Sequence, residues 1–128
     1  MSAASTQKKI LLVDDDPLIV RMYERKLAKE GFAVTLAPNG EEAFKALEKD
    51  TPDLILLDVL MPKMNGWEVL KKLKENEKTK NIPVITLTSL GDKPEDIQKF
   101  KELGVKEYLV KSNVDLKALV EMIRKHIA

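Results

Sequence analysis

Four short apolar runs in this sequence each end in side chains that could bind a cation or a phosphoryl group. Three consecutive aspartates, at 14 to 16, follow the first run, and Asp58 follows the second. The third run ends in the hydroxyl of Thr88, and the fourth ends in the amine of Lys111. Carboxylates held close together repel one another unless a cation lies among them. The pattern therefore favours a hard divalent cation beside a phosphoryl group.

The apolar runs themselves are typical of β-strands buried on both faces, as in a parallel sheet. They cover residues 11–13, 54–57, 84–87 and 108–110. In an open parallel sheet, ligands bind beyond the carboxyl ends of the strands. The four polar ends are therefore expected to meet at one edge of the sheet.

Amphipathic helical segments separate the runs. Pro17 begins the first of them and Gly31 ends it, as expected for a proline at a helix start and a glycine just past a helix end. One face of this segment is expected to pack inward, and it carries Ile19, Met22, Tyr23 and Leu27. A solvated lysine face is expected on the third helical segment and the turn after it, at Lys71, Lys72, Lys74, Lys78 and Lys80.

A further strand is expected at 32–37. With it, the sequence alternates between a strand and a helix five times. This alternation predicts an α/β fold with a doubly wound parallel sheet and helices on both faces. We expect a single three-layer domain over residues 8–128, preceded by a short disordered arm at 1–7.

Composition narrows the possible functions. The chain has 128 residues and a formal net charge of +1, which predicts no long-range attraction to nucleic acid. It has no cysteine, so a thiolate metal site is excluded. No apolar stretch approaches the roughly 20 residues that span a bilayer, and residues 1–7 do not form a secretory signal. A cytoplasmic protein without membrane or direct nucleic-acid partners is expected.

Five separated elements of the sequence agree in type and spacing with one known family. They are the acidic cluster after the first strand, Asp58, Met61-Pro62 with Asn65-Gly66, Thr88, and Lys111. In these elements the chain resembles the receiver domain of two-component response regulators, such as the chemotaxis regulators, over residues 8–127. The resemblance implies a flavodoxin-like (βα)5 fold with strand order 2-1-3-4-5.

The resemblance also implies a metal site for Mg²⁺, with Mn²⁺ possible in its place. Asp15 would ligate the ion directly, and Asp14 would act mainly through ordered water. Asp58 would be both a metal ligand and the phosphoacceptor, and the backbone carbonyl of Leu60 would supply another oxygen. Asp16 is instead expected to begin the first helix, where its charge suits the helix dipole.

The remaining site residues implied by the resemblance act on the phosphoryl group. Thr88 would bond a phosphoryl oxygen through its hydroxyl, with help from the amide of Ser89. Lys111 would pair with Asp58 and then with the phosphoryl group. Tyr108 would change position when Thr88 is drawn to the phosphate, although a strand aromatic with only a packing role is an equal alternative.

The implied function is phosphoryl acceptance from a sensor histidine kinase or a histidine phosphotransfer protein. The domain would then signal to a downstream protein through the face formed by the fourth helix, the fifth strand and the fifth helix. It would be a monomer or a weak, phosphorylation-dependent dimer. It is expected not to be a turnover enzyme, although it would assist its own phosphorylation and dephosphorylation.

Three residues depart from the family pattern or tune it. Ser112 stands where the family usually has a proline after the lysine, so the peptide bond between Lys111 and Ser112 is expected to be trans. Leu60 and Leu90 are apolar and cannot orient an attacking water, which predicts a long-lived phosphoryl group.

Two other functions remain open at this point. One is a protein-binding module that keeps the fold and works without phosphate. The other is a Mg²⁺-dependent phosphatase-like enzyme, which the absence of a second acid in Asp58-Val59-Leu60 makes the weaker alternative.

Overall fold

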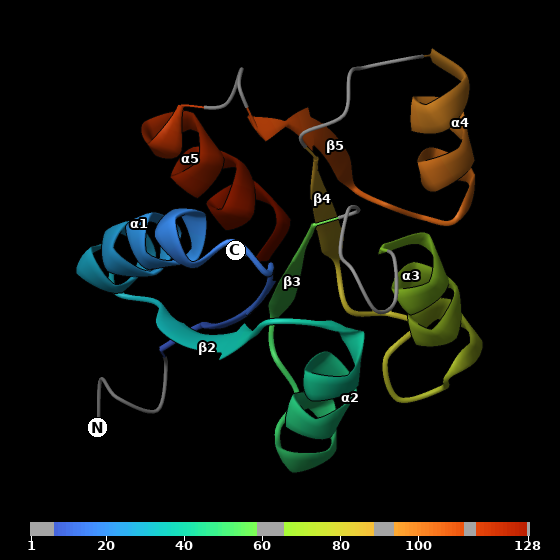
Figure 1. Cartoon of the computed structure of the whole chain (residues 1–128), viewed down its shortest axis with the longest axis horizontal. Coiled ribbons are helices and arrows are strands. Elements are labelled where there is room, and N and C mark those ends of the chain that lie inside the picture. The colour runs from blue at the N-terminus through green and yellow to red at the C-terminus, as the bar shows by residue number, and fades with distance from the viewer. Residues whose placement is uncertain (1–6, 59–65, 89–93, 112–114, 128) are drawn as a thin grey trace.

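The computed structural model describes residues 7–58, 66–88, 94–111 and 115–127. The side chains of Thr88 and of residues 94–96 are also outside the described part. Five strands and five helices alternate along it (Figure 1). The strands are β1 (Lys9–Val13), β2 (Ala33–Ala37), β3 (Leu54–Asp58), β4 (Val84–Thr88) and β5 (Glu107–Val110). The helices are α1 (Pro17–Lys29), α2 (Gly40–Lys49), α3 (Gly66–Glu75), α4 (Pro94–Glu102) and α5 (Leu116–Ile127).

All neighbouring strands are parallel, and their order across the sheet is β2-β1-β3-β4-β5. The predicted flavodoxin-like order is therefore confirmed. The strand register places Val13 beside Leu57 and Thr88 beside Val110, so the carboxyl ends of β1, β3, β4 and β5 lie along one edge.

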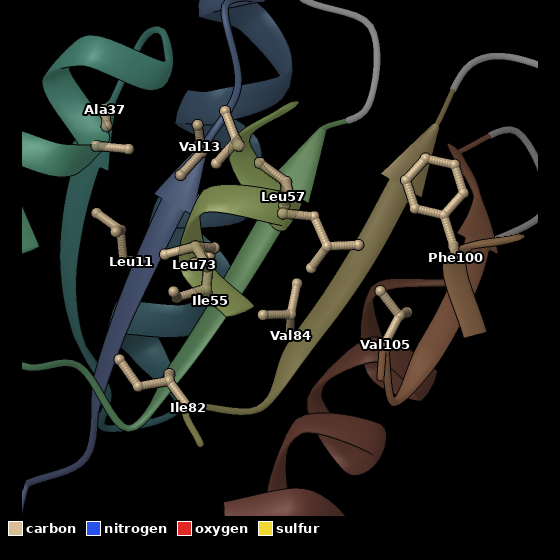
Figure 2. Close-up of a cluster of buried hydrophobic side chains, with 13 residues drawn as sticks. Leu11, Val13, Ala37, Ile55, Leu57, Leu73, Ile82, Val84, Phe100 and Val105 are labelled. Carbon is tan, nitrogen blue, oxygen red and sulfur yellow. The ribbon is translucent and has the colours of Figure 1, made fainter. Parts of the chain in front are cut away.

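Two hydrophobic clusters lie on the two faces of the sheet and follow from the alternation of side chains along each strand. Leu11 and Ile55 face the layer of α2, α3 and α4, whereas Leu12 and Leu56 face α1 and α5. The first cluster is drawn in Figure 2, with Leu73 of α3 packed against the strands. Figure 1 shows α1 and α5 together on one side of the sheet and the other helices on the opposite side. The three-layer arrangement is confirmed.

Helix ends follow the local sequence signals. The Asp16 carboxylate accepts hydrogen bonds from the amides of Leu18 and Ile19 and caps α1, as predicted. Gly31, directly after the cap residue Glu30, has a φ of 97°, a backbone conformation that favours glycine.

Two predictions about side-chain exposure are wrong. Met22 is 46% exposed, because the buried stripe of α1 runs through Tyr23 and Leu27 and leaves position 22 at its edge. Lys74 is half-buried, and its Nζ donates a hydrogen bond to the Lys80 carbonyl at 3.2 Å. The turn after α3 folds back over Lys74, which the helical pattern could not reveal.

Among the described helices, none combines the length and the apolar composition needed to cross a membrane.

Candidate functional site

The candidate site begins where β1 and β3 end side by side. Asp14 follows β1 directly, and its amide donates a hydrogen bond to the Ala37 carbonyl at 3.1 Å, which extends the pairing with β2 by one residue. Asp58 is the last residue of β3. Because Val13 is in register with Leu57, the two aspartates occupy adjacent positions at the edge of the sheet.

Three carboxylates converge at this edge. Asp14, Asp15 and Asp58 each contribute an oxygen, and these oxygens all lie within 4.8 Å of one another. Asp14 and Asp58 are 2% and 3% exposed, whereas Asp15 is open to solvent. Buried carboxylates this close to each other need positive charge to offset their repulsion and desolvation.

Lys111 supplies part of that charge from the end of β5. Its Nζ lies 2.8 Å from Asp14 Oδ2 and 3.4 Å from Asp58 Oδ2. Burial acts to lower the pKa of Lys111, but the hydrogen bond and charge of Asp14, together with Asp58, outweigh it and raise the pKa above its ordinary value. Lys111 is therefore a fixed cation at neutral pH. It contacts both carboxylates, and the nearer one is that of Asp14.

Asp16 is turned away from this group. Its carboxylate caps α1, while its amide donates a hydrogen bond to Asp14 Oδ1 at 3.0 Å. This bond orients the Asp14 carboxylate and occupies one of its oxygens, while Lys111 contacts the other. Three consecutive aspartates thus have two different roles, because the chain turns from strand to helix between them.

Tyr23 is a neighbour of the site that sequence reasoning assigned only to the packed face of the first helix. It is 3% exposed and belongs to the cluster between the sheet and α1 and α5. Burial raises the pKa of its phenol; the Lys111 charge opposes the rise, and the charges of Asp14 and Asp58 add to it. No sequence signal distinguishes a tyrosine near the site from one that only packs.

Several predicted site residues fall at the limits of the described part. The backbone of Thr88 ends β4 beside Val110, as the prediction requires, but its side chain lies outside the described part. Tyr108 lies in β5 beside Thr86. The predictions for Leu60, Ser89, Leu90 and the bond between Lys111 and Ser112 concern residues outside the described ranges.

Comparison with known proteins decides the family. Residues 10–124 match the family model of the response regulator receiver domain. The chain belongs to this family. Receiver domains are signalling domains of two-component systems, and they are not turnover enzymes.

The receiver domain is similar to curated regulators over part of their length. It is 42% identical over 103 residues to the response regulator PleD of Caulobacter vibrioides, which covers 80% of this chain and 22% of PleD. It is 37% identical over 106 residues to the ycf27 protein of Guillardia theta, and it spans 40% of that protein. This chain therefore corresponds to less than half the length of these relatives.

Solved structures of receivers share the fold. The chemotaxis protein CheY4 of Vibrio cholerae is 32% identical with a TM-score of 0.86, and the match covers 94% of this chain and 98% of CheY4. The Mn²⁺-bound form of response regulator Rcp1 is 34% identical with a TM-score of 0.77, and the match covers 92% of this chain and 90% of Rcp1.

Proposed function

We propose that this receiver domain accepts a phosphoryl group on Asp58 from a phosphohistidine of a sensor kinase or a phosphotransfer protein. The observation that supports this most directly is the meeting of the Asp14, Asp15 and Asp58 carboxylates with the Lys111 ammonium at the carboxyl edge of the sheet. Asp58 is the nucleophile in this proposal. One of its oxygens bonds to phosphorus as the nitrogen–phosphorus bond breaks, and the released imidazole takes up a proton.

The neighbouring residues act on charge and position. The Lys111 ammonium lies 3.4 Å from the Asp58 carboxylate and would stabilise the negative charge that develops on the phosphoryl oxygens. In the proposal, the Thr88 hydroxyl and the Ser89 amide bond the same oxygens. Asp14, which holds Lys111 at 2.8 Å, would position the lysine as well as the metal.

The donor set suits a hard divalent cation, because all three carboxylates offer oxygen at one place. We propose Mg²⁺, or Mn²⁺ in its place, held by Asp15 and Asp58 directly, by Asp14 through water, and by the carbonyl of Leu60. When bound, the ion would neutralise charge on the transferring phosphoryl group.

Phosphorylation replaces the single charge of the Asp58 carboxylate with a phosphoryl group that carries about two negative charges and three acceptor oxygens, and signalling follows from this change. In the proposal, Thr88 is drawn to the phosphoryl group, Tyr108 changes position, and the face of α4, β5 and α5 binds a downstream protein. The domain would act in the cytoplasm as one folded unit over residues 8–128. It would be a monomer or a weak, phosphorylation-dependent dimer.

Incubation with acetyl phosphate and MgCl₂ tests this function. The intact protein should gain the mass of one phosphoryl group, and EDTA should prevent the gain. Borohydride reduction followed by peptide mapping should place homoserine at position 58, because borohydride reduces an acyl phosphate to an alcohol. Binding of Mg²⁺ without any gain in mass would favour a protein-binding module that works without phosphate.

Mg²⁺ is expected to raise the melting temperature of the protein, because it binds the folded carboxylate group and not the unfolded chain. At a concentration 100-fold above the dissociation constant, the gain in unfolding free energy is about 2.7 kcal/mol. Asp15→Asn should remove most of this gain, measured by thermal melts in MgCl₂ and in EDTA. Asp50→Asn is the matched control, since Asp50 pairs with Lys9 outside the carboxylate group. An equal loss in both variants would contradict the metal assignment.

A further inference from the structure

Three aromatic rings from three different elements form a continuous row beside the sheet. The ring centroids of Trp67 in α3 and Phe100 in α4 are 5.3 Å apart, with the rings edge to face at 90°. The centroids of Phe100 and Tyr108 in β5 are 5.4 Å apart, with the rings tilted by 48°. Both are favourable geometries for aromatic pairs. The row therefore joins the strand that carries Tyr108 to the first turn of α3.

Phe100 is the middle member of this row and is 8% exposed. Figure 2 shows its ring at the β4 and β5 end of the buried cluster. Trp67 and Tyr108 are only partly buried and pack against that cluster. Since protein interiors are close-packed, a change in the Tyr108 ring position requires Phe100 to repack. Repacking of Phe100 in turn changes the contact on the Trp67 ring.

One end of the row lies beside the strand that leads to the proposed phosphorylation site. Tyr108 is in register with Thr86 of β4, and Thr88 ends the same strand two residues later. At the other end, the exposed Lys99 places its Nζ 5.0 Å from the centroid of the Trp67 ring. Through the buried Phe100, the row thus connects β5 near the site to a cation–aromatic pair at the surface.

We propose that Phe100 couples Tyr108 to Trp67, so that phosphorylation of Asp58 changes the surroundings of Trp67 and the position of Lys99. The surface that responds to phosphorylation then includes the start of α3 in addition to α4, β5 and α5. This inference rests on the proposed function, because it takes phosphorylation of Asp58 as the event that moves Tyr108.

Trp67 provides its own readout, because the sequence contains one tryptophan. Its emission is recorded with MgCl₂ alone and then with MgCl₂ and acetyl phosphate, while the phosphorylated fraction is measured by intact mass. The wild-type emission should change in proportion to that fraction. Comparison with MgCl₂ alone removes any direct effect of the metal on the indole.

Phe100→Leu is the variant that decides the proposal. It should be phosphorylated to the same extent as the wild type but lose most of the phosphorylation-dependent change in Trp67 emission. Phe44→Leu is the matched control, because Phe44 of α2 packs against the same cluster. Its ring also lies under a lysine, Lys72 of α3. This control should retain the full change. If Phe100→Leu does not fold by circular dichroism, Phe100→Met removes the ring while keeping its bulk.

The outcomes separate the two proposals. A gain in mass on Asp58 with no change in Trp67 emission would overturn the coupling and leave the proposed function intact. A change that persists in the folded Phe100 variant would also overturn the coupling. Absence of any mass gain in the wild type would contradict the proposed function, and with it the coupling.

Discussion

Asp58→Asn is expected to abolish phosphoryl uptake from acetyl phosphate while the protein remains folded. Asparagine matches the shape of aspartate, but its neutral amide cannot act as the nucleophile that forms an acyl phosphate. Asp58 is 3% exposed at the end of β3, in a position that an isosteric side chain can fill. The substitution also removes one of three mutually repelling carboxylates. Intact mass after incubation with MgCl₂ measures uptake, and circular dichroism measures folding.

Asp16→Asn is the matched control for this experiment. Asp16 belongs to the same acidic sequence cluster, but its side chain caps α1, and asparagine caps a helix about as well as aspartate. This variant should take up phosphate like the wild type. Continued uptake by Asp58→Asn at the wild-type level would show that another residue is the acceptor and would contradict the proposed chemistry.

Lys111→Met is expected to lower the unfolding free energy in metal-free buffer by about 3 kcal/mol, because removal of one partner leaves buried charges without compensation. The Lys111 ammonium contacts both Asp14 and Asp58, and the Asp14 side chain is 1% exposed. The raised pKa of Lys111 means that its stabilising charge is fully present below its ordinary value of 10.5 and is lost only as the pH rises through the raised value. The deficit should therefore be constant across neutral pH, as measured by urea denaturation.

Lys74→Met is the control, because it removes a half-buried lysine that does not lie beside Asp14 and Asp58. Burial lowers the pKa of Lys74, and the charge of Lys106 lowers it further. The protein therefore stabilises the ammonium of Lys74 less than that of Lys111. Replacement by methionine should change the unfolding free energy little.

Mg²⁺ should reduce the loss of unfolding free energy that Lys111→Met causes, since a bound cation supplies positive charge to the same carboxylates. A Lys111 variant as stable as the wild type in EDTA would show that Asp14 and Asp58 do not depend on this ammonium.

The α/β fold and the meeting of the Asp14, Asp15 and Asp58 carboxylates with Lys111 could be predicted from the sequence. Alternating strands and helices predicted the parallel sheet, and the resemblance to receivers predicted its order. Because parallel strands bring their carboxyl ends to one edge, the positions of Asp14, Asp58 and Lys111 after apolar runs already indicated a common site. These features depend on local periodicity, which a single sequence records directly.

The pairing of side chains and their burial, by contrast, could be read only from the three-dimensional structure. It placed Lys111 nearest to Asp14, buried Tyr23 near the site, covered Lys74 and aligned Trp67 with Phe100 and Tyr108. Each of these contacts joins elements that are separated along the chain or covers a side chain with a later turn. Their geometry is set by how helices and strands pack in three dimensions, and neither residue type nor helical spacing carries that information.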